Sequence, residues 1–170
     1  GYEDTTVEEI IELSGTSKGS FYHYFDGKDA LLSTLSSLFD EKYEELTGLL
    51  TPEMTAMEQL LFLNRELFHM IEDSISLDLL ARLYSTQLTT NGEKHLLDHN
   101  RIYYKLLRKI IAKGQAEGQL SSRSNVNEMV KLYALCERAL LYDWCLCAGE
   151  YALTEYSAKV LPGFLSSFLP

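Results

Sequence analysis

Side chains suited to contacting DNA are concentrated in residues 15–25, which read Gly-Thr-Ser-Lys-Gly-Ser-Phe-Tyr-His-Tyr-Phe. Phe21 and Phe25 are four residues apart, so on a helix both face inward and leave a polar and aromatic face outside. Ser17 is a good N-cap for this helix. Side chains near the start of such a helix reach base edges when it lies in a major groove. The pattern therefore predicts a DNA-reading helix with these outward residues: Lys18, Ser20, Tyr22, His23 and Tyr24.

A second short helix is predicted immediately before the reading helix. Residues 6–14 place apolar side chains at positions 7, 10, 11 and 13, which is the spacing of one helix face. Thr6 is a suitable N-cap, and Gly15 supplies the tight corner between the two helices. Two short helices joined by such a corner indicate a helix-turn-helix.

These motifs, with Lys-Asp-Ala-Leu-Leu at residues 28–32, resemble the DNA-binding signature of the TetR family of bacterial transcriptional regulators. The resemblance implies an all-α fold with a helix-turn-helix DNA-binding domain over residues 1–46. A helical effector-binding and dimerisation domain is expected over residues 47–170. In the family another helix precedes the position at which this chain begins, so we expect a truncated DNA-binding domain whose first helix is absent.

The resemblance also implies roles for single residues. Thr6 matches a cap that contacts phosphate, and Lys28 matches a residue that grips phosphate at the start of the next helix. Tyr22 and Tyr24 resemble positions that contact phosphate or base, and Gly19 lets the backbone approach the DNA closely. The function implied is a ligand-responsive transcriptional regulator, a repressor that binds a palindromic operator as a homodimer.

The charge of the chain favours an alternative to a DNA-binding function. The formal net charge is −10, and residues 1–30 hold two lysines against seven carboxylates, whereas DNA-binding surfaces are usually basic. Helix N-termini and hydroxyl groups also hold phosphates, without any net charge. The alternative is an all-helical ligand-binding or protein-interaction module with a degenerate helix-turn-helix that does not bind DNA.

Helical periodicity continues through the rest of the chain. We expect helices at about 28–50, 53–73, 77–88, from 93 or 97 to 117, 126–148 and from 154 onward, with Pro52 in a first turn and a kink or stop at Pro162. The first of these helices has an apolar stripe that includes Leu35, Phe39, Tyr43 and Leu46, and Asn125 can cap the helix at 126–148. In residues 126–148, 17 of 23 side chains are hydrophobic, so both sides of this helix need cover. Two consecutive apolar helices at the end of the chain therefore predict a two-fold homodimer.

A small-molecule effector of unknown identity is expected between the middle helices. Apolar side chains with a few polar groups among them are typical of ligand pockets, although ordinary core packing explains most of these residues equally well. Asn64 lies on an apolar stripe, and we expect it to bond within the protein rather than to a ligand. The candidate lining residues are Phe62, Arg65, Phe68, His69, Tyr84, Gln87, Tyr103, Leu107 and Trp144.

The sequence contains no recognisable catalytic motif, so we predict neither an enzyme nor a cofactor. His95 and His99 have the i, i+4 spacing of two ligands on one helix face, but no further ligand accompanies them, so no metal is predicted. The three cysteines do not suggest a disulfide framework, which favours the cytoplasm. No apolar run is long enough to span a membrane, so no membrane partner is expected.

Overall fold

The computed structural model describes residues 28–89, 91–92 and 94–170, and these residues form six α-helices and two short 3-10 helices without any strand. The predicted all-α fold is therefore confirmed. In chain order the elements are α3 (Lys28–Leu49), α4 (Ala56–Ser74), α5 (Leu77–Thr89), η2 (His95–Leu97), α6 (Ile102–Ala116), α7 (Val126–Leu146), α8 (Leu153–Leu165) and η3 (Ser166–Phe168).

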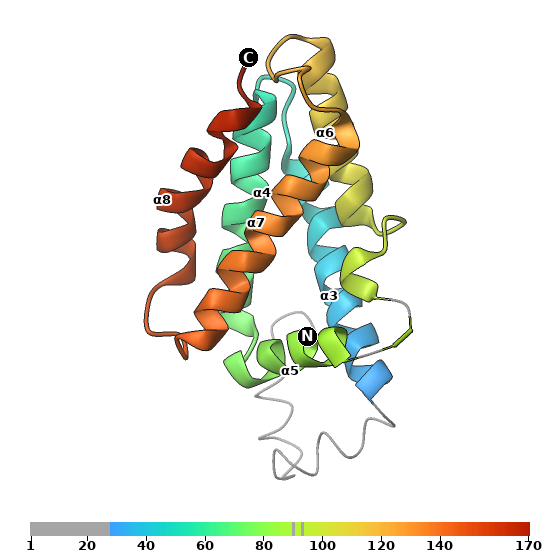
Figure 1. Cartoon of the computed structure of the whole chain (residues 1–170), viewed down its shortest axis with the longest axis vertical. Coiled ribbons are helices and arrows are strands. Elements are labelled where there is room, and N and C mark those ends of the chain that lie inside the picture. Colours follow the sequence, from blue (N-terminus) through green and yellow to red (C-terminus); the bar gives the residue numbers. More distant parts are fainter. Residues whose placement is uncertain (1–27, 90, 93) are drawn as a thin grey trace.

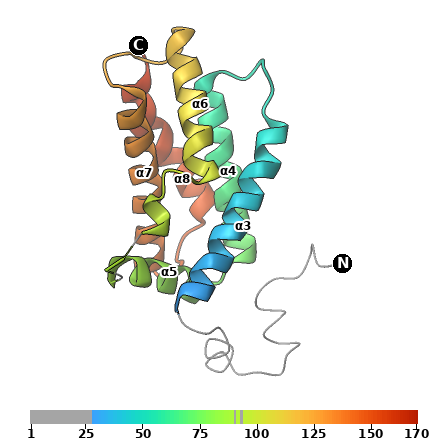
Figure 2. The ribbon, with the colours of Figure 1, turned by 90° about the vertical axis from the view of Figure 1, so that its right-hand side faces the viewer.

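Helix α4 lies in the middle of the bundle, where it packs against α3, α6 and α8. Helix α7 packs on α6 and α8, and α5 lies across the end of the bundle at which α3 begins (Figure 1). Seen from the side, α3 runs obliquely along α6 and α4 (Figure 2). None of the described helices is both long and apolar enough to cross a membrane.

Helix α3 follows its sequence pattern closely. Leu35, Phe39, Tyr43 and Leu46 are buried, and their spacing of four, four and three residues keeps them on one helical face. This face enters the same core as α4, α5 and α6. The helix expected at 28–50 is thus confirmed, and α3 packs into the core of the bundle from Leu35 onward. The domain boundary at residue 46, which lies inside α3, stays a prediction.

Helix α4 begins later than expected. Thr55, not the segment around Pro52, is its N-cap, and Ala56 is its first residue. The Thr55 hydroxyl accepts from the Glu58 N–H at 3.2 Å, and the Glu58 carboxylate accepts from the Thr55 N–H at 2.7 Å. This reciprocal capping satisfies two backbone donors that a start at Pro52 would leave open.

The predicted start of α6 is also wrong, because residues 95–97 form the separate element η2 and α6 begins only at Ile102. The Leu96 N–H donates to Gln87 Oε1 at 3.0 Å, and the Leu96 carbonyl accepts from the Tyr104 hydroxyl at 2.7 Å. These backbone groups are thus satisfied by side chains of α5 and α6 rather than by helical bonds. His95 and His99 consequently share no helix face, and the described residues contain no metal-binding cluster.

The two C-terminal helices are close to expectation. Asn125 caps α7 as predicted, accepting from the Glu128 N–H at 2.9 Å. Helix α8 does not stop at Pro162 but continues to Leu165. Leu161 and Leu165 are fully buried on either side of the proline, and their burial offsets the single helical bond that proline removes.

The start of α8 depends on a side chain from another helix. Its N-cap position, Ala152, has no side chain that could cap. Glu72 of α4 supplies the cap instead, accepting from the Leu153 N–H at 2.6 Å and the Thr154 N–H at 2.9 Å. A carboxylate at a helix N-terminus is also favoured by the helix dipole. The position of α8 is therefore tied directly to α4.

Substituting alanine for Gly114 should lower the free energy of unfolding by about 1–2 kcal/mol, because α6 passes very close to α4 here. A Cβ atom at Gly114 would lie 2.5 Å from the Ala56 Cβ and 2.8 Å from the Leu120 Cδ1. Urea unfolding measures the effect. Gly48→Ala is the matched control, since a Cβ there meets no described atom within 4 Å, and it should raise stability by about 0.5–1 kcal/mol. Equal effects of the two substitutions would contradict the close approach.

Candidate functional site

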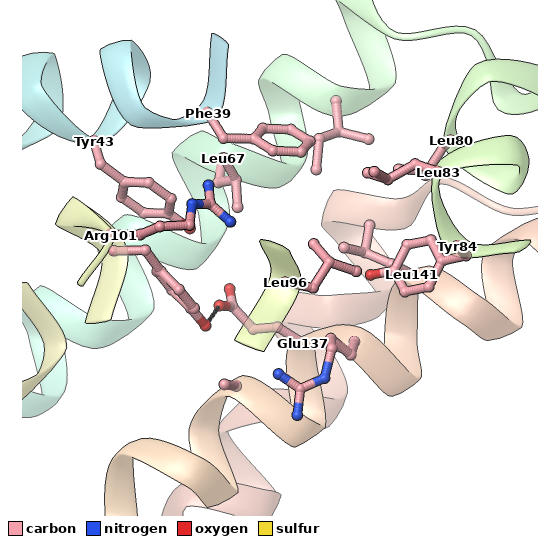
Figure 3. Close-up of a pocket in the computed structure, with 14 residues that line it drawn as sticks. Phe39, Tyr43, Leu67, Leu80, Leu83, Tyr84, Leu96, Arg101, Glu137 and Leu141 are labelled. Carbon is pink, nitrogen blue, oxygen red and sulfur yellow. Dashed lines mark hydrogen bonds between the residues drawn. The ribbon is translucent and has the colours of Figure 1, made fainter. Parts of the chain in front are cut away.

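A small cavity of about 60 Å³ lies inside the bundle, between α3, α4, α5, α7 and the segment that leads into α6 (Figure 3). Most of its wall is apolar, with a few polar and charged side chains among the aliphatic and aromatic ones. The lining residues are Phe39, Tyr43, Leu67, Ile71, Leu80, Leu83, Tyr84, Leu96, Arg101, Tyr103, Ala134, Glu137, Arg138 and Leu141.

Glu137 of α7 is the buried acid of this wall, with only 4 % of its surface exposed. Its Oε1 accepts from the Tyr103 hydroxyl at 2.5 Å, and its Oε2 accepts from Asn64 Nδ2 at 2.7 Å. Burial raises the pKa of Glu137, while the Tyr103 and Asn64 hydrogen bonds and the nearby charge of Arg138 act in the opposite direction. Both carboxylate oxygens are therefore already engaged within the protein.

The hydrogen bonds of Glu137 continue to α8. Asn64 of α4 uses its Nδ2 for Glu137, and its Oδ1 accepts from the Ser157 hydroxyl at 2.6 Å. Tyr103, Glu137, Asn64 and Ser157 thus connect α6, α7, α4 and α8 through the core. The expectation that Asn64 bonds within the protein is confirmed, and its amide orientation is determined by its two partners.

Arg101 is the buried cation of the cavity wall. Its side chain is 9 % exposed, and its Nη2 lies 3.1 Å from the Asp40 Oδ1 of α3. Its Nη1 reaches the His95 carbonyl at 3.5 Å, at the limit of a hydrogen bond. Its Nε is buried without a hydrogen-bond partner among the described residues. Arg101 therefore ties the segment before α6 to α3 while part of its donor capacity remains unused.

The tyrosines of the cavity present neutral hydroxyl groups. Burial raises the pKa values of Tyr43, Tyr84 and Tyr103 above that of an ordinary tyrosine. Each of them therefore keeps its proton at neutral pH. A ligand would meet Tyr43 and Tyr84 as neutral groups that can donate or accept a hydrogen bond, whereas Tyr103 could only accept one, because its proton is donated to Glu137.

The cavity is closed on one side by residues 94–101. Leu96 packs into the core from η2, held by Gln87 and by Tyr104, which in turn accepts from Arg138 Nη1 at 3.2 Å. Lys94 donates to the Gln87 carbonyl as well. Ligand pockets usually measure about 300–1,000 Å³, so this cavity is smaller than a typical ligand pocket.

The nine residues predicted to line a pocket are not brought together. Tyr84 and Tyr103 line the cavity, and Gln87 adjoins it by holding η2. Phe62 and Arg65 instead line a separate outer groove of about 540 Å³ between α4 and α8.

The remaining four are placed elsewhere. Phe68 and Leu107 are fully buried core residues, and Trp144 donates from its Nε1 to the Tyr151 carbonyl at 2.9 Å. His69 is exposed and lies 3.3 Å from Asp73. Neither the cavity nor the outer groove contains all nine residues, and their role in binding a ligand stays a prediction.

Sequence reasoning missed Glu137, Arg138 and Arg101. A signal for the first two was present, because Glu137 and Arg138 interrupt the most apolar helix of the chain, where charged side chains need partners. Arg101 carried no such signal, since it lies at the edge of a helix in a polar stretch. Its burial depends on how residues 94–101 fold back on α3.

Of the predicted DNA-contacting residues, only Lys28 lies within the described part of the chain, as the first residue of α3. The other positions lie outside the described residues, so their roles stay predictions. These positions are Thr6, Lys18, Gly19, Ser20, Tyr22, His23 and Tyr24.

Comparisons with known proteins agree with this organisation. Residues 1–35 match the family model described as bacterial regulatory proteins, tetR family. An uncharacterised HTH-type transcriptional regulator of Bacillus subtilis, YuxN, is 40% identical over 52 residues, which span 30% of this chain and 18% of YuxN.

Two solved structures share the fold. FadR from Bacillus subtilis, solved in complex with stearoyl-CoA, has a TM-score of 0.70 and 21% identity. FadR from Bacillus halodurans, a fatty acid degradation regulator, has a TM-score of 0.69 and 19% identity. Each comparison covers 99% of this chain and 91% of the other.

Proposed function

We propose that this chain, a member of the TetR family of bacterial regulatory proteins, is a ligand-responsive repressor that binds a palindromic DNA operator as a homodimer. The observation that carries the proposal is the continuity between the two parts of the chain. Residues 1–35 carry the family's DNA-binding segment, and α3 continues directly from it. The same helix then supplies Phe39 and Tyr43 to the cavity wall.

This continuity suggests how a ligand acts on DNA binding. A ligand that widens the cavity pushes on Phe39 and Tyr43, and thereby displaces α3 together with the DNA-reading segment at its start. The ligand favours repressor release if it binds the widened state more tightly than the closed state. The difference between these two affinities is the coupling free energy between ligand and operator.

We infer that the effector carries a long acyl chain. The wall of the cavity is predominantly aliphatic and aromatic, which suits a hydrocarbon chain. The FadR protein of similar fold from Bacillus subtilis was solved with stearoyl-CoA, which supports the same ligand class. Because the chromosomal operator is its target, we place the protein in the cytoplasm.

The homodimer would form through α7 and α8. Apolar side chains on the outer surfaces of these two helices remain exposed in the single chain, although residues of this type are normally buried at interfaces. A two-fold dimer would present two reading helices at the spacing of operator half-sites. The exposed residues are Leu135, Tyr142, Leu146, Tyr156 and Phe164.

A gel-shift titration with fragments of the DNA upstream of the protein's own gene tests DNA binding by the full-length protein. Lys18→Ala and Tyr22→Ala should each weaken specific binding about tenfold or more, because each removes a contact to phosphate or base. Lys109→Ala, at an exposed position of α6, removes the same charge as Lys18→Ala and should leave binding nearly unchanged. Specific DNA binding that is unchanged by both Lys18→Ala and Tyr22→Ala would contradict the assignment of these residues to the DNA contact.

A second candidate function is supported by the seven carboxylates among residues 1–30. In this alternative the chain is a ligand-binding or protein-interaction module that has lost DNA binding. The same titration distinguishes the two functions. Full-length protein that binds the acyl ligand, but binds no DNA fragment at low salt, would favour the alternative.

A further inference from the structure

We propose that the effector is an organic acid whose carboxylate enters the cavity and takes the place of Asp40 on Arg101. This inference rests on the proposed function, since it specifies the ligand of the same cavity. It assigns Arg101 as the residue that recognises the anionic group. It also makes the Arg101–Asp40 ion pair the contact that the ligand breaks.

The first support is the incomplete bonding of a buried guanidinium. Arg101 is more than nine-tenths buried in the cavity wall, where a cation requires anionic or strongly polar partners. The N–H bonds of Nε and Nη2 lie in the guanidinium plane along one edge of the group, where they form a fork suited to both oxygens of one carboxylate. Asp40 contacts only Nη2, through Oδ1 at 3.1 Å, and Nε has no partner in the part of the chain that the structure describes.

A ligand carboxylate could fill both arms of this fork. It would replace one hydrogen bond by two parallel ones, which is the stronger arrangement for arginine and carboxylate. The displaced Asp40 side chain is 30 % exposed, so water can solvate its carboxylate once it is released. The exchange therefore leaves no buried charge without a partner.

The second support is the N-terminus of α6, the helix that Arg101 immediately precedes. Arg101 is its N-cap residue, and no described side chain caps the helix at this point. The first N–H groups of an α-helix favour an anion, and α6 is 15 residues long. An anion held by Arg101 would thus also benefit from the helix dipole.

The other charges of the cavity are consistent with this site. Glu137 already accepts hydrogen bonds on both oxygens, and Arg138 lies near enough to offset its charge. Glu137 is therefore a poor partner for a ligand cation. Arg101 is the cation of the wall that has a buried donor without a partner among the described residues, so the wall favours an anionic ligand over a cationic one.

The exchange would also transmit ligand binding to DNA. Asp40 belongs to α3, whereas Arg101 belongs to the segment that closes the cavity. Loss of the ion pair frees residues 94–101 and α3 from each other, at the moment the acyl chain widens the cavity. Ligand recognition and release of the DNA-reading helix would then depend on the same guanidinium.

Calorimetric titration of the full-length protein with three probes of equal chain length tests the proposal. The probes are hexadecanoate, the neutral hexadecanol and hexadecanoyl-CoA. Hexadecanoate should bind about tenfold to a hundredfold more tightly than hexadecanol, which is the range expected for hydrogen bonds to a charged group. Binding of hexadecanoyl-CoA without binding of hexadecanoate would place the anion outside the cavity and overturn the proposal.

Three variants test whether Arg101 is the residue that binds the ligand carboxylate. Arg101→Met should reduce the preference for acid over alcohol to nearly one, with an alcohol affinity equal to or above that of the unsubstituted protein, because the variant also lacks the ion pair with Asp40. Asp40→Asn should increase hexadecanoate affinity several-fold, because it removes the competing carboxylate while leaving Arg101 in place. The control Arg82→Met removes an arginine from an exposed ion pair with Asp78 and should change neither affinity.

The two variants that alter the ion pair act in opposite directions, so loss of folding in one cannot imitate the pattern. An unchanged acid preference in Arg101→Met, or equal binding of acid and alcohol by the unsubstituted protein, would overturn the role of Arg101 alone. The acyl ligand of the proposed function would survive that result. Absence of binding by all three probes would overturn both.

Discussion

Glu137→Leu should lower the free energy of unfolding by about 2–4 kcal/mol at neutral pH. Leucine fills a similar volume but accepts no hydrogen bond, so the Tyr103 hydroxyl and Asn64 Nδ2 lose their partner inside the core. Each buried donor left unsatisfied costs about 1–3 kcal/mol. Thermal and urea unfolding of the variant measure the effect. A loss below about 1 kcal/mol would show that water replaces the carboxylate in these bonds.

Glu137→Gln is the matched control for this prediction, because it keeps the shape and one acceptor. Folding raises the pKa of Glu137, so the folded protein binds this proton more tightly than the unfolded chain. The stability of the unsubstituted protein relative to Glu137→Gln should therefore fall as the pH rises. The fall begins near the ordinary glutamate pKa of about 4.3 and ends at the folded pKa.

Within this window the slope is at most about 1.4 kcal/mol per pH unit, because a single proton is involved. Comparing the two proteins cancels the titration of the other carboxyl groups. Unfolding curves measured at a series of pH values determine the difference. A difference that rises with pH would mean that the hydrogen bonds outweigh burial and hold the pKa below its ordinary value.

Leu135→Glu should dissociate the proposed homodimer, with a dimer Kd at least about a hundredfold higher than that of the unsubstituted protein. Leu135 lies on the outer face of α7 with 49 % of its surface exposed, so the glutamate does not disturb the fold of the single chain. In the proposed two-fold interface the substitution buries one new carboxylate from each subunit, and neither has a partner of opposite charge. Sedimentation over a concentration range measures the Kd.

Leu49→Glu is the control, because Leu49 is 54 % exposed at the end of α3 and the added charge is the same. This variant should remain dimeric. The monomeric Leu135→Glu protein should also bind the palindromic operator more weakly, since its two reading helices no longer bind as a unit. A dimer unaffected by Leu135→Glu would place the subunit contact elsewhere on the surface.

Much of the fold follows from local sequence. The stripe from Leu35 to Leu46 predicted α3, and Asn125 predicted the start of α7, because periodicity and capping act within a few residues. The expected start of α4 at Pro52 is wrong, because the capping box of Thr55 and Glu58 begins the helix three residues later. This capping box is also a local pattern of the sequence.

The start of α6 could not be predicted in the same way. The backbone of Leu96 is satisfied by Gln87 and Tyr104, which lie nine and eight residues away on different helices. The cap of α8 comes from Glu72, more than 80 residues earlier in the chain. Partners at such distances are specified by packing, and no pattern in a short window contains them.

The motif in residues 15–25 and the apolar periodicity of the later helices were sufficient to indicate the family and the helical fold. They depend on neighbouring residues, and helical geometry converts such spacing directly into faces and caps. The residues that line the cavity, in contrast, are far apart in the sequence. Glu137 meets Tyr103 across 34 residues and Asn64 across 73, and Arg101 meets Asp40 across 61. These polar groups come together only because burial of the apolar helix faces forces them into one core, where each must find a partner.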